Sequence, residues 1–516
     1  MIPEAVFAML ASTHIGAIHV VVFGGFAPAE CAKRIESAKP TVILTASCGV
    51  EGSKTIPYLP FVRQAIALSA HKPLHTIVFQ RDELYAPLDR TLHELPWTSL
   101  VRSYKARNGH NGRPPYPSLA RDPDGRTYEV GASLPATAPH YLLHTSGTTG
   151  TPKPITRALS HLVGLSYTRH LFNLSPGTTI FTASDIGWVV GHSYIIYAPL
   201  LAGATSILYE GKPTTTPDAS SFFRIIAENR VNTLSCAPSA FRAILASDPE
   251  LARGKSHNTE SFTRLFLAGE RSEPTLITSL RRLLPHTEVI DNWWSTESGS
   301  PISAAYPGSN APAGSAGRLM PGFNLIANNG RLEFIPPLPP TGLVGVYESP
   351  KRFAAYFTPD GTIDTGDLGR IERGVVTIDG RSDDIINVAS HRLSAGTIEE
   401  ACRTVQGVAE AYVVPVADPL KGEVPVAFLV LGKDAGVEEE VKRGVQESVR
   451  AQVGPIAGLG DIWVVDAGVV PRTRSGKVLR RAFRGLCSGE EAVPEEVERR
   501  EWRALGRRVR GTGAKL

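Results

Sequence analysis

At 516 residues the chain is longer than one hydrophobic core usually extends, so we expect two or more domains. With 42% apolar and 20% charged residues, its composition is that of a globular protein and argues against a fibrous or disordered chain. The net charge of +4 is small for this length and the basic residues are spread out, which argues against nucleic acid as the main partner.

The five cysteines are far apart and form no CxxC pair, which disfavours a disulfide framework or a zinc site and favours a reducing compartment. One uncharged stretch, 188–209, has the length of a membrane span, but it contains His192, Ser193 and Pro199. We expect this stretch to form buried core and the wall of a ligand pocket, and we expect no membrane span.

The first part of the chain alternates between helix and strand patterns, which predicts a doubly wound α/β fold. A helix opens at the first residues, with Pro3 at a helix-start position and Val6 and Met9 on one face. The region 71–136 is polar and rich in Pro, Arg and Gly, which predicts loops and short elements. The other predicted elements are a strand at 17–23, a helix at 28–38, and strands at 41–45, 141–144, 179–183, 206–209, 233–236 and 265–267.

After about residue 379 the pattern changes and predicts a separate, small α+β domain. Its predicted elements are a helix at 397–404, strands at 411–416 and 424–431, a helix at 437–453 and a strand at 462–465. The segment 490–515 is acidic first and arginine-rich later, as in a solvated helix followed by a tail. We therefore expect a large domain at 1–381, a small domain at 382–486 and a charged tail at 487–516.

A loop rich in Gly, Ser and Thr follows the predicted strand at 141–144. It reads Thr145-Ser146-Gly147-Thr148-Thr149-Gly150-Thr151-Pro152-Lys153. Glycines let backbone N–H groups approach phosphate oxygens, and hydroxyls and a lysine add donors and charge. The spacing is not that of a Walker P-loop, and an ordinary loop would also explain the motif taken alone.

A second cluster places a carboxylate beside two indole rings. It reads Asp291-Asn292-Trp293-Trp294-Ser295-Thr296-Glu297. Glu297 could hold Mg²⁺ against phosphates, because this cation usually takes one or two carboxylates together with nucleotide oxygens. A tryptophan pair in a core strand is the alternative.

Two further clusters are charged. Asp367, in the sequence DTGD, could accept hydrogen bonds from both ribose hydroxyls, and Arg381, in GRSDD, could add a donor. His391 and Arg392 follow them. The last cluster, PRTRSGK, ends at Lys477, which could reach a phosphate as a point charge. A solvated turn and a basic surface loop are the respective alternatives.

In this order and at these intervals, the four clusters resemble the adenylate-forming superfamily of acyl-CoA synthetases, luciferases and peptide-synthetase adenylation domains. The segments DIGWVVGHSY at 185–194 and WWSTESG at 293–299 resemble its acetyl/propionyl-CoA synthetase branch. The segments SCGV at 47–50, LAGER at 267–271 and ADPLKG at 417–422 look closer to propionyl-CoA synthetases. The resemblance covers essentially the whole chain up to the tail. It implies a large domain of doubly wound mixed sheets and a small α+β domain that rotates.

The resemblance implies a two-step reaction. A short-chain carboxylate, propionate or acetate, reacts with ATP and Mg²⁺ to give an acyl-adenylate and pyrophosphate, and the thiol of coenzyme A then displaces AMP. The nucleophiles belong to the substrates, so catalysis should be positioning and charge stabilisation.

The family's functional positions carry over residue by residue. The phosphate loop comprises Thr145, Ser146, Gly147, Thr148, Thr149, Gly150 and Lys153. The groups around adenine and the α-phosphate are Gly269, Glu270, Arg271, Asp291, Asn292, Trp293, Trp294, Ser295 and Thr296. Asp367 and Arg381 bind ribose, and the catalytic residues are Lys477, Arg392, Thr296 and Glu297, of which Glu297 is also the metal ligand.

The resemblance implies an acyl pocket walled by Val189, Ala268 and Trp294. The indole of Trp294 leaves little depth for longer acyl chains. Acetate and propionate are not separated by this argument, because one methylene is worth only about 1–3 kcal/mol in an apolar pocket. The coenzyme A positions are Val190, Ala389 and Arg450, and the hinge of the rotating domain is Asp383.

The sequence departs from the family at several positions. Pro154 and Ser390 stand where the family usually has glycine, and the family's large domain normally begins before the residue that matches Met1. Two alternatives therefore stay open: a catalytically impaired nucleotide- or acyl-binding relative, and an adenylating enzyme with a different acceptor. We expect a cytoplasmic protein, with mitochondria as the alternative because any targeting peptide would lie before Met1.

Overall fold

The computed structural model describes residues 1–24, 26–108, 119–121, 127–129, 133–145, 152–211, 217–270, 272–382, 385–388, 391–418, 421–432, 435–472, 478–489 and 499–511. It divides into two compact units. Unit 1 comprises Met1–Asn324 and Phe334–Ile363, and unit 2 comprises Leu325–Glu333 and Asp364–Leu516. Our domain bounds at 381 and 486 stay predictions.

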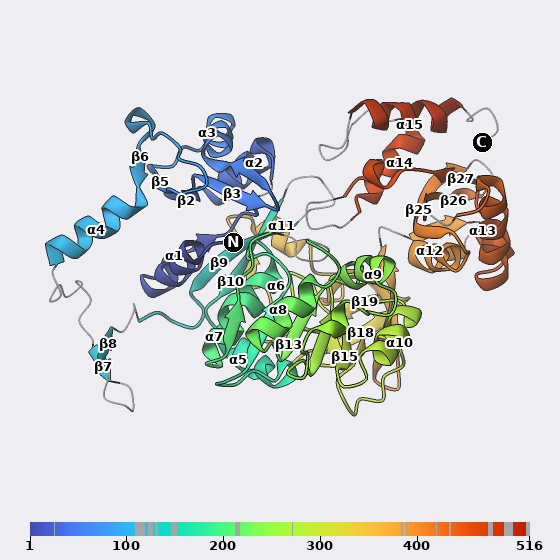
Figure 1. Cartoon of the computed structure of the whole chain (residues 1–516), viewed down its shortest axis with the longest axis horizontal. Helices are drawn as coiled ribbons and strands as arrows, with labels where there is room; N and C mark the ends of the chain where they lie inside the picture. The colour runs from blue at the N-terminus through green and yellow to red at the C-terminus, as the bar shows by residue number, and fades with distance from the viewer. Residues whose placement is uncertain are drawn as a thin grey trace. The chain divides into compact units, whose positions relative to one another are not determined.

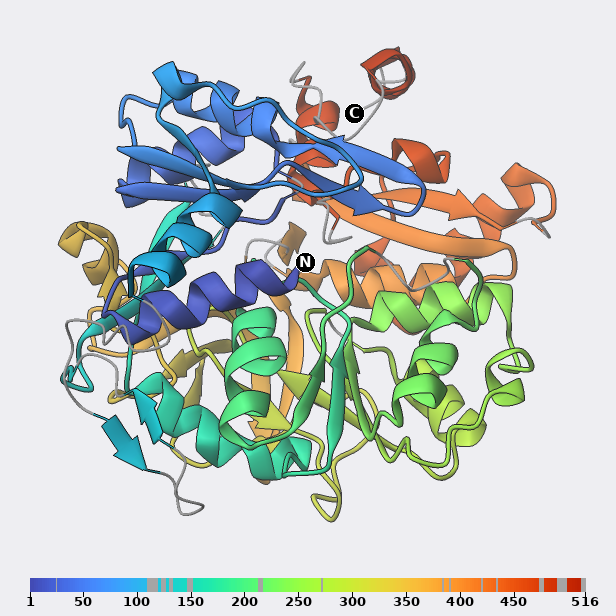
Figure 2. The ribbon, with the colours of Figure 1, turned by 60° about the vertical axis from the view of Figure 1, so that its left-hand side comes forward.

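The N-terminal part of unit 1 forms a small layer beside a mixed sheet (Figure 1). Its strands β2 (Val42–Ala46), β5 (His75–Phe79) and β6 (Glu94–Pro96) are parallel, and helices α2 (Pro28–Ala38) and α3 (Tyr58–Leu68) pack together beside them. The neighbouring sheet has the order β1 (His19–Val20), β9 (Pro139–Thr145), β10 (Lys153–Ala158) and β20 (Gly345–Val346). Figure 2 shows α1 (Pro3–His14) between the small blue layer and the green part of the unit.

The main sheet of unit 1 is parallel over five strands. In order they are β12 (Thr205–Ile207), β11 (Thr179–Thr182), β13 (Thr233–Cys236), β14 (Arg264–Leu267) and β15 (Glu288–Trp293), and the antiparallel β16 (Ser303–Ala304) and β17 (Gly317–Leu319) follow.

Both faces of this sheet are covered. Leu265 and Val289 face a core with helices α8 (Ser221–Asn229), α9 (Pro238–Ser247) and α10 (Pro274–Leu283), whereas Phe266 and Ile290 face one that contains α5 (His161–Phe172). A parallel sheet needs this double cover, and the doubly wound α/β prediction is confirmed.

The uncharged stretch is buried core, as predicted. It forms α6 (Val189–Gly191), the π-helical turn η2 (His192–Tyr197) and α7 (Ala198–Leu201), and every residue of η2 is buried. Within the described ranges, no helix has the length and apolar character needed to cross a membrane.

Unit 2 begins with strands β18 (Leu325–Asn328), β19 (Arg331–Phe334), β21 (Ile363–Glu372) and β22 (Val375–Arg381). A second sheet follows in the order β24 (His391–Ser394), β23 (Ile385–Val388), β26 (Gly422–Leu431) and β25 (Val408–Asp418), with β27 (Asp461–Val464) beside β26. Helices α12 (Ala395–Arg403) and α13 (Glu438–Gln452) share one core with it, and α14 (Arg480–Ser488) and α15 (Arg499–Gly511) share another.

Two expectations need correction. The region 71–136 contains a full helix, α4 (Trp97–Asn108), besides short strands. The helix expected near the C-terminus is present as α15, but it is not merely solvated, because Trp502 is 2% exposed and packs with Phe483.

Four histidines from different elements lie together in the core of unit 1. They are His19 of β1, His140 of β9, His161 of α5 and His192 of η2. The rings of His19 and His192 stack with centroids 5.7 Å apart, and the ring of His140 lies 5.4 Å from that of His161. Burial lowers the pKa of His140 to about 4 and that of His192 to about 3, and it holds the pKa of His19 and His161 well below the usual value.

This histidine cluster predicts a pH-dependent stability. Below about pH 6.5 the unfolded chain takes up protons that the folded chain does not, so the free energy of unfolding falls as the pH is lowered. Each histidine adds a slope of roughly 1.4 kcal/mol per pH unit until its folded pKa is reached. We expect the midpoint of urea unfolding to fall between about pH 7.5 and pH 5, and to fall less steeply in His161→Leu. Equal pH dependence in both proteins would contradict this role of the cluster.

A half-buried ion pair ties α14 to Glu399 of α12, which also contacts strand β25 of unit 2. Glu399 accepts hydrogen bonds from Arg480 Nη2 at 2.8 Å, from Arg480 Nε at 3.0 Å and from the backbone N–H of Val413 at 3.0 Å. In Arg480→Ala the buried carboxylate of Glu399 loses its strongest partner, and we expect the free energy of unfolding to fall by about 3 kcal/mol in a denaturant titration. The matched control is Glu438→Ala, which removes an exposed pair with Lys442 and should cost under about 0.5 kcal/mol. Equal losses would mean that the half-buried pair does not anchor α14.

Candidate active site

The carboxyl ends of β13, β14 and β15 lie next to one another in the parallel sheet. Their register pairs Cys236 with Leu267 and Leu267 with Asp291. Ligands of open α/β sheets bind outside this edge. The predicted groups 268–270 and 291–294 are therefore brought to one edge of unit 1, although they come from separate motifs.

The turn after β14 is held by charge and by backbone conformation. Gly269 has a φ of +100°, a region in which a side chain is strained. Glu270 accepts from the backbone N–H of Ser239 at 2.7 Å and pairs with Arg242 at 2.7 Å. Burial raises the pKa of Glu270, but Arg242 and Ser239 outweigh it, so the pKa lies below its usual value and the carboxylate is ionised.

Asp291 and Asn292 are buried at the end of β15. Asp291 accepts from the hydroxyl of Ser272 at 3.0 Å, and Asn292 Nδ2 donates to the carbonyl of Leu267 at 3.1 Å. The other side-chain atom, Asn292 Oδ1, is buried and has no hydrogen-bond partner among the described residues. A buried acceptor without a donor is costly, so this oxygen is suited to a ligand amino group or a bound water.

Tyr356 connects two motifs that are far apart in the sequence. Its hydroxyl donates to Glu297 Oε1 at 2.9 Å, and Lys153 Nζ lies 4.7 Å from the centre of its ring. Burial, followed by the charge of Glu297, raises the pKa of Tyr356, so its hydroxyl stays protonated. The structure therefore brings the end of the phosphate loop and the predicted metal ligand together. Tyr356 is not predictable from the sequence alone, because nothing in the surrounding RFAAYF segment marks it.

The short segment 295–299 is a hydrogen-bonded turn. The backbone N–H of Gly299 donates to the carbonyl of Ser295 at 3.2 Å, and the N–H of Ser295 donates to the hydroxyl of Ser298 at 3.1 Å. Arg157 of β10 donates to the carbonyls of Thr296 and Glu297. Arg157 is not predictable from the sequence either, since a single arginine in a strand belongs to no motif.

Pro154 lies within β10, opposite His144 of β9. The carbonyl of Pro154 accepts a hydrogen bond from the backbone N–H of Tyr347 at 2.9 Å. Proline can form this bond because it supplies only the carbonyl and needs no N–H of its own. This departure from the family pattern therefore fits the strand as folded.

Two of the three residues expected to wall the acyl pocket pack against the same core of unit 1. Val189 and Trp294 both pack against the core that contains Tyr194, and the rings of Trp294 and Tyr194 meet edge to face at 5.5 Å. Val190 packs there too, whereas Ala268 follows β14 at the sheet edge.

In unit 2, Asp367 of β21 lies opposite Arg381 of β22. Arg381 Nη1 is 3.4 Å from Asp367 Oδ1 and 3.3 Å from the carbonyl of Thr365. Gly366, with a φ of +72°, allows this approach, because a Cβ there would lie 2.8 Å from the guanidinium. Arg450 is exposed in the last turn of α13.

Several predicted residues lie outside the described part of the chain. They are Ser146, Gly147, Thr148, Thr149, Gly150, Arg271, Asp383, Ala389 and Lys477. Arg392 lies on β24, but its side chain is not described. Their roles stay predictions.

The described residues fit Mg²⁺ better than a metal with an all-protein cage. No group of three or more His, Cys, Asp or Glu is arranged around a metal position in the described ranges. Glu297 Oε2 takes no hydrogen bond from any described residue, so it is open to a cation that completes its shell with phosphate and water.

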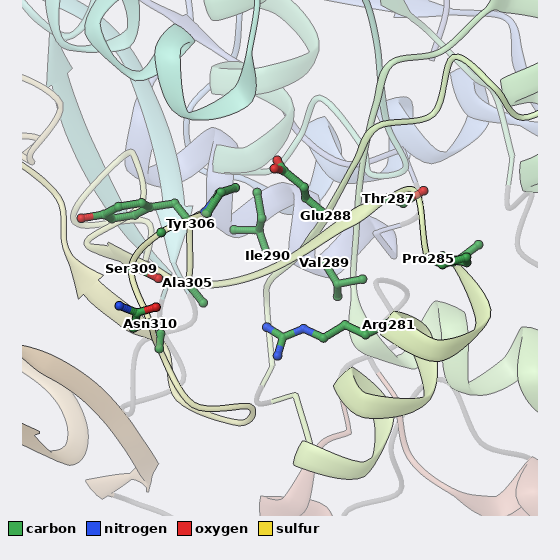
Figure 3. Close-up of a pocket in the computed structure, with 14 residues that line it drawn as sticks. Arg281, Pro285, Thr287, Glu288, Val289, Ile290, Ala305, Tyr306, Ser309 and Asn310 are labelled. Carbon is green, nitrogen blue, oxygen red and sulfur yellow. The ribbon is translucent and has the colours of Figure 1, made fainter.

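A pocket elsewhere in unit 1 contains none of the predicted site residues. It lies between α10, β15 and the loop after β16 (Figure 3). Figure 3 shows Arg281 and Glu288 on different sides of β15, and Glu288 is paired with Arg264 at 2.9 Å. This arrangement does not form a converging set of ligand groups.

Comparisons with known proteins identify the family. The profile of the family described as AMP-binding enzyme matches residues 1–337, and that of the AMP-binding enzyme C-terminal domain matches residues 397–477. The acyl-CoA synthetase short-chain family member 3, mitochondrial, of Mus musculus is 37% identical over 95% of this chain and 71% of its own length. The propionate–CoA ligase of Salmonella typhimurium is 36% identical over 95% of this chain and 78% of its own.

A solved structure supports the fold. The acetoacetyl-CoA synthetase from Streptomyces lividans superposes with a TM-score of 0.82 at 20% identity, over 99% of this chain and 76% of that one. The two profile matches and the curated relatives agree with the resemblance seen in the motifs. The chain belongs to the AMP-binding enzyme family.

Proposed function

We propose that this protein is a short-chain acyl-CoA synthetase, which activates propionate or acetate with ATP and transfers the acyl group to coenzyme A. The observation that carries the proposal is the contact of Tyr356 with both Glu297 and Lys153, since it gathers a phosphate-binding lysine and a carboxylate at one place. The relatives named propionate–CoA ligase and short-chain acyl-CoA synthetase support the substrate class.

In the first step the phosphate loop, from Thr145 to Lys153, binds the β- and γ-phosphates through backbone N–H groups, hydroxyls and the lysine. The adenine lies against the turn of Gly269 and the end of β15. There the unpartnered Asn292 Oδ1 accepts from the exocyclic amino group. Asp367 accepts from the ribose hydroxyls, and Arg381 holds this carboxylate in place.

Glu297 would hold Mg²⁺, which supplies charge neutralisation at the phosphates. Thr296 and Arg392 bind the α-phosphate, and Lys477 holds the attacking carboxylate against it. No side chain acts as a nucleophile, so the chain contributes orientation and charge.

In the second step we propose that rotation at Asp383 withdraws Lys477 and admits coenzyme A past Val190, Ala389 and Arg450. The acyl chain lies between Val189, Ala268 and Trp294. The indole, which is fixed by the ring of Tyr194, limits the chain to a few carbons.

Release of pyrophosphate from ATP tests the proposal. With Mg²⁺ we expect release that depends on propionate or acetate, and acyl-CoA only when coenzyme A is present. ATP binding without release would favour the impaired relative. Release without any thioester would favour a different acceptor.

A further inference from the structure

Arg157 is a fully buried cation. It lies on β10, is 1% exposed, and donates through Nη2 to the carbonyl of Thr296 and through Nη1 to the carbonyls of Thr341 and Glu297. Among the described residues no carboxylate pairs with it. Three carbonyl oxygens therefore replace the water and the counter-ion that a guanidinium would otherwise have.

This arrangement is expensive for stability. Removing a charge from water costs several kcal/mol, and here no opposite charge in the described part of the chain offsets that cost. Burial raises the pKa of Tyr141 and lowers the pKa of His161 and His192, so these neighbours in the same core are neutral and none of them is a counter-ion for Arg157. We therefore look for the role of Arg157 in the backbone carbonyls to which it donates.

The donors of Arg157 hold the backbone next to the predicted catalytic side chains. A guanidinium is planar and rigid, so two of its nitrogens fix carbonyls at a set distance from one another. Gly299 makes room for it, since a Cβ there would lie 2.2 Å from the carbonyl oxygen of Thr341 and 3.0 Å from Arg157 Cζ. Lys153 begins the strand that carries Arg157, so β10 links the phosphate loop to this segment.

We propose that Arg157 is a positioning residue that fixes the backbone of Thr296 and Glu297 and thereby aims the Glu297 carboxylate at the metal–nucleotide complex. This inference rests on the proposed function. Tyr356 restrains the carboxylate itself, and Arg157 restrains the chain that carries it. A misplacement of about 1 Å can cost on the order of 100-fold in rate.

The test is Arg157→Met, which keeps the length and removes the donors. We expect the affinity of Mn²⁺ for the protein with ATP bound, measured by the electron paramagnetic resonance signal of Mn²⁺, to fall about tenfold or more. The pyrophosphate-release rate should fall about 100-fold. Formation of propionyl-CoA from supplied propionyl-adenylate should change little. The urea midpoint should change little, because the cost of leaving the three carbonyls without donors opposes the gain from removing a buried charge. Arg157→Lys keeps the positive charge but lacks the planar guanidinium with its several donors. Its Mn²⁺ affinity and pyrophosphate-release rate should lie between those of wild type and Arg157→Met.

The matched control is Arg34→Met, which removes another buried guanidinium, one that binds Glu30 and lies 3.8 Å from the ring of Phe26. It should leave Mn²⁺ affinity unchanged. A folded Arg157→Met protein with wild-type Mn²⁺ affinity overturns the inference. The inference also fails if Arg157→Met slows both half-reactions equally and lowers the urea midpoint. If wild type binds Mn²⁺ and ATP but releases no pyrophosphate with any acid, the proposed function fails, while the affinity comparison still decides the role of Arg157.

Discussion

Replacing Lys477 by alanine is expected to remove adenylate formation and to spare thioester formation. In the proposed mechanism the lysine stabilises the carboxylate and the α-phosphate only while they react, so its loss should remove transition-state stabilisation worth about 10²–10³ in rate or more. The second step starts from a finished adenylate and needs no such bridge. The measurement is pyrophosphate release from ATP and propionate beside propionyl-CoA formation from supplied propionyl-adenylate.

Lys255→Ala is the control for Lys477→Ala, because Lys255 is exposed on a short 3₁₀ turn of unit 1 and has no proposed role. It should leave both half-reactions at the wild-type rate. If Lys477→Ala slows the two half-reactions equally, the lysine does not act in one step alone, and the division of labour is wrong.

Replacing Trp294 by glycine is expected to lengthen the accepted acid. The indole packs edge to face on Tyr194. If it forms one end of the acyl pocket as proposed, its removal opens depth without adding a polar group. Each methylene then buried is worth about 1–3 kcal/mol, or roughly 10–200-fold in kcat/KM. We expect the preference to move from propionate to acids with about two or three more carbons, read as kcat/KM across a series from acetate to octanoate.

Trp294→Phe is the graded control, since a phenyl ring fills part of the space and should give a smaller shift. The cavity in Trp294→Gly should also lower the free energy of unfolding by about 3–5 kcal/mol, so rates are compared at a temperature where both variants are folded. A folded glycine variant with the wild-type substrate order would remove Trp294 from the pocket wall.

Local signals in the sequence predict many of the elements. Helix α2 spans Pro28–Ala38 as predicted, because proline opens it and Lys39 closes it in the left-handed conformation. The strand expected at 17–23 is only His19–Val20, since its parallel partner β9 pairs with no more than these two residues. Helix α4 is not among the predicted elements, although Trp97, Leu100, Val101 and Tyr104 have helical spacing, because the polar, proline-rich region around them favours loops.

Those residues of the candidate site that belong to short sequence motifs are predictable from the sequence. Asp291 and Glu270 are found at one sheet edge because parallel strands carry their loops to the same side. Tyr356 and Arg157 could not be found in this way. Tyr356 reaches Glu297 across 59 positions, and Arg157 reaches Thr296 across 139, so only tertiary packing brings them together. The unpartnered Asn292 Oδ1 is likewise visible only once the burial around it is known.

We propose that Asn292, Asp367 and Trp294 bind the adenine, the ribose and the acyl chain of one acyl-adenylate. A crystal structure with propyl-AMP, a stable mimic of the acyl-adenylate, tests it most directly. The account predicts adenine beside Asn292, ribose hydroxyls on Asp367, and the propyl chain ending at Trp294. Density that places the ribose away from Asp367, or the propyl group away from Trp294, would contradict it.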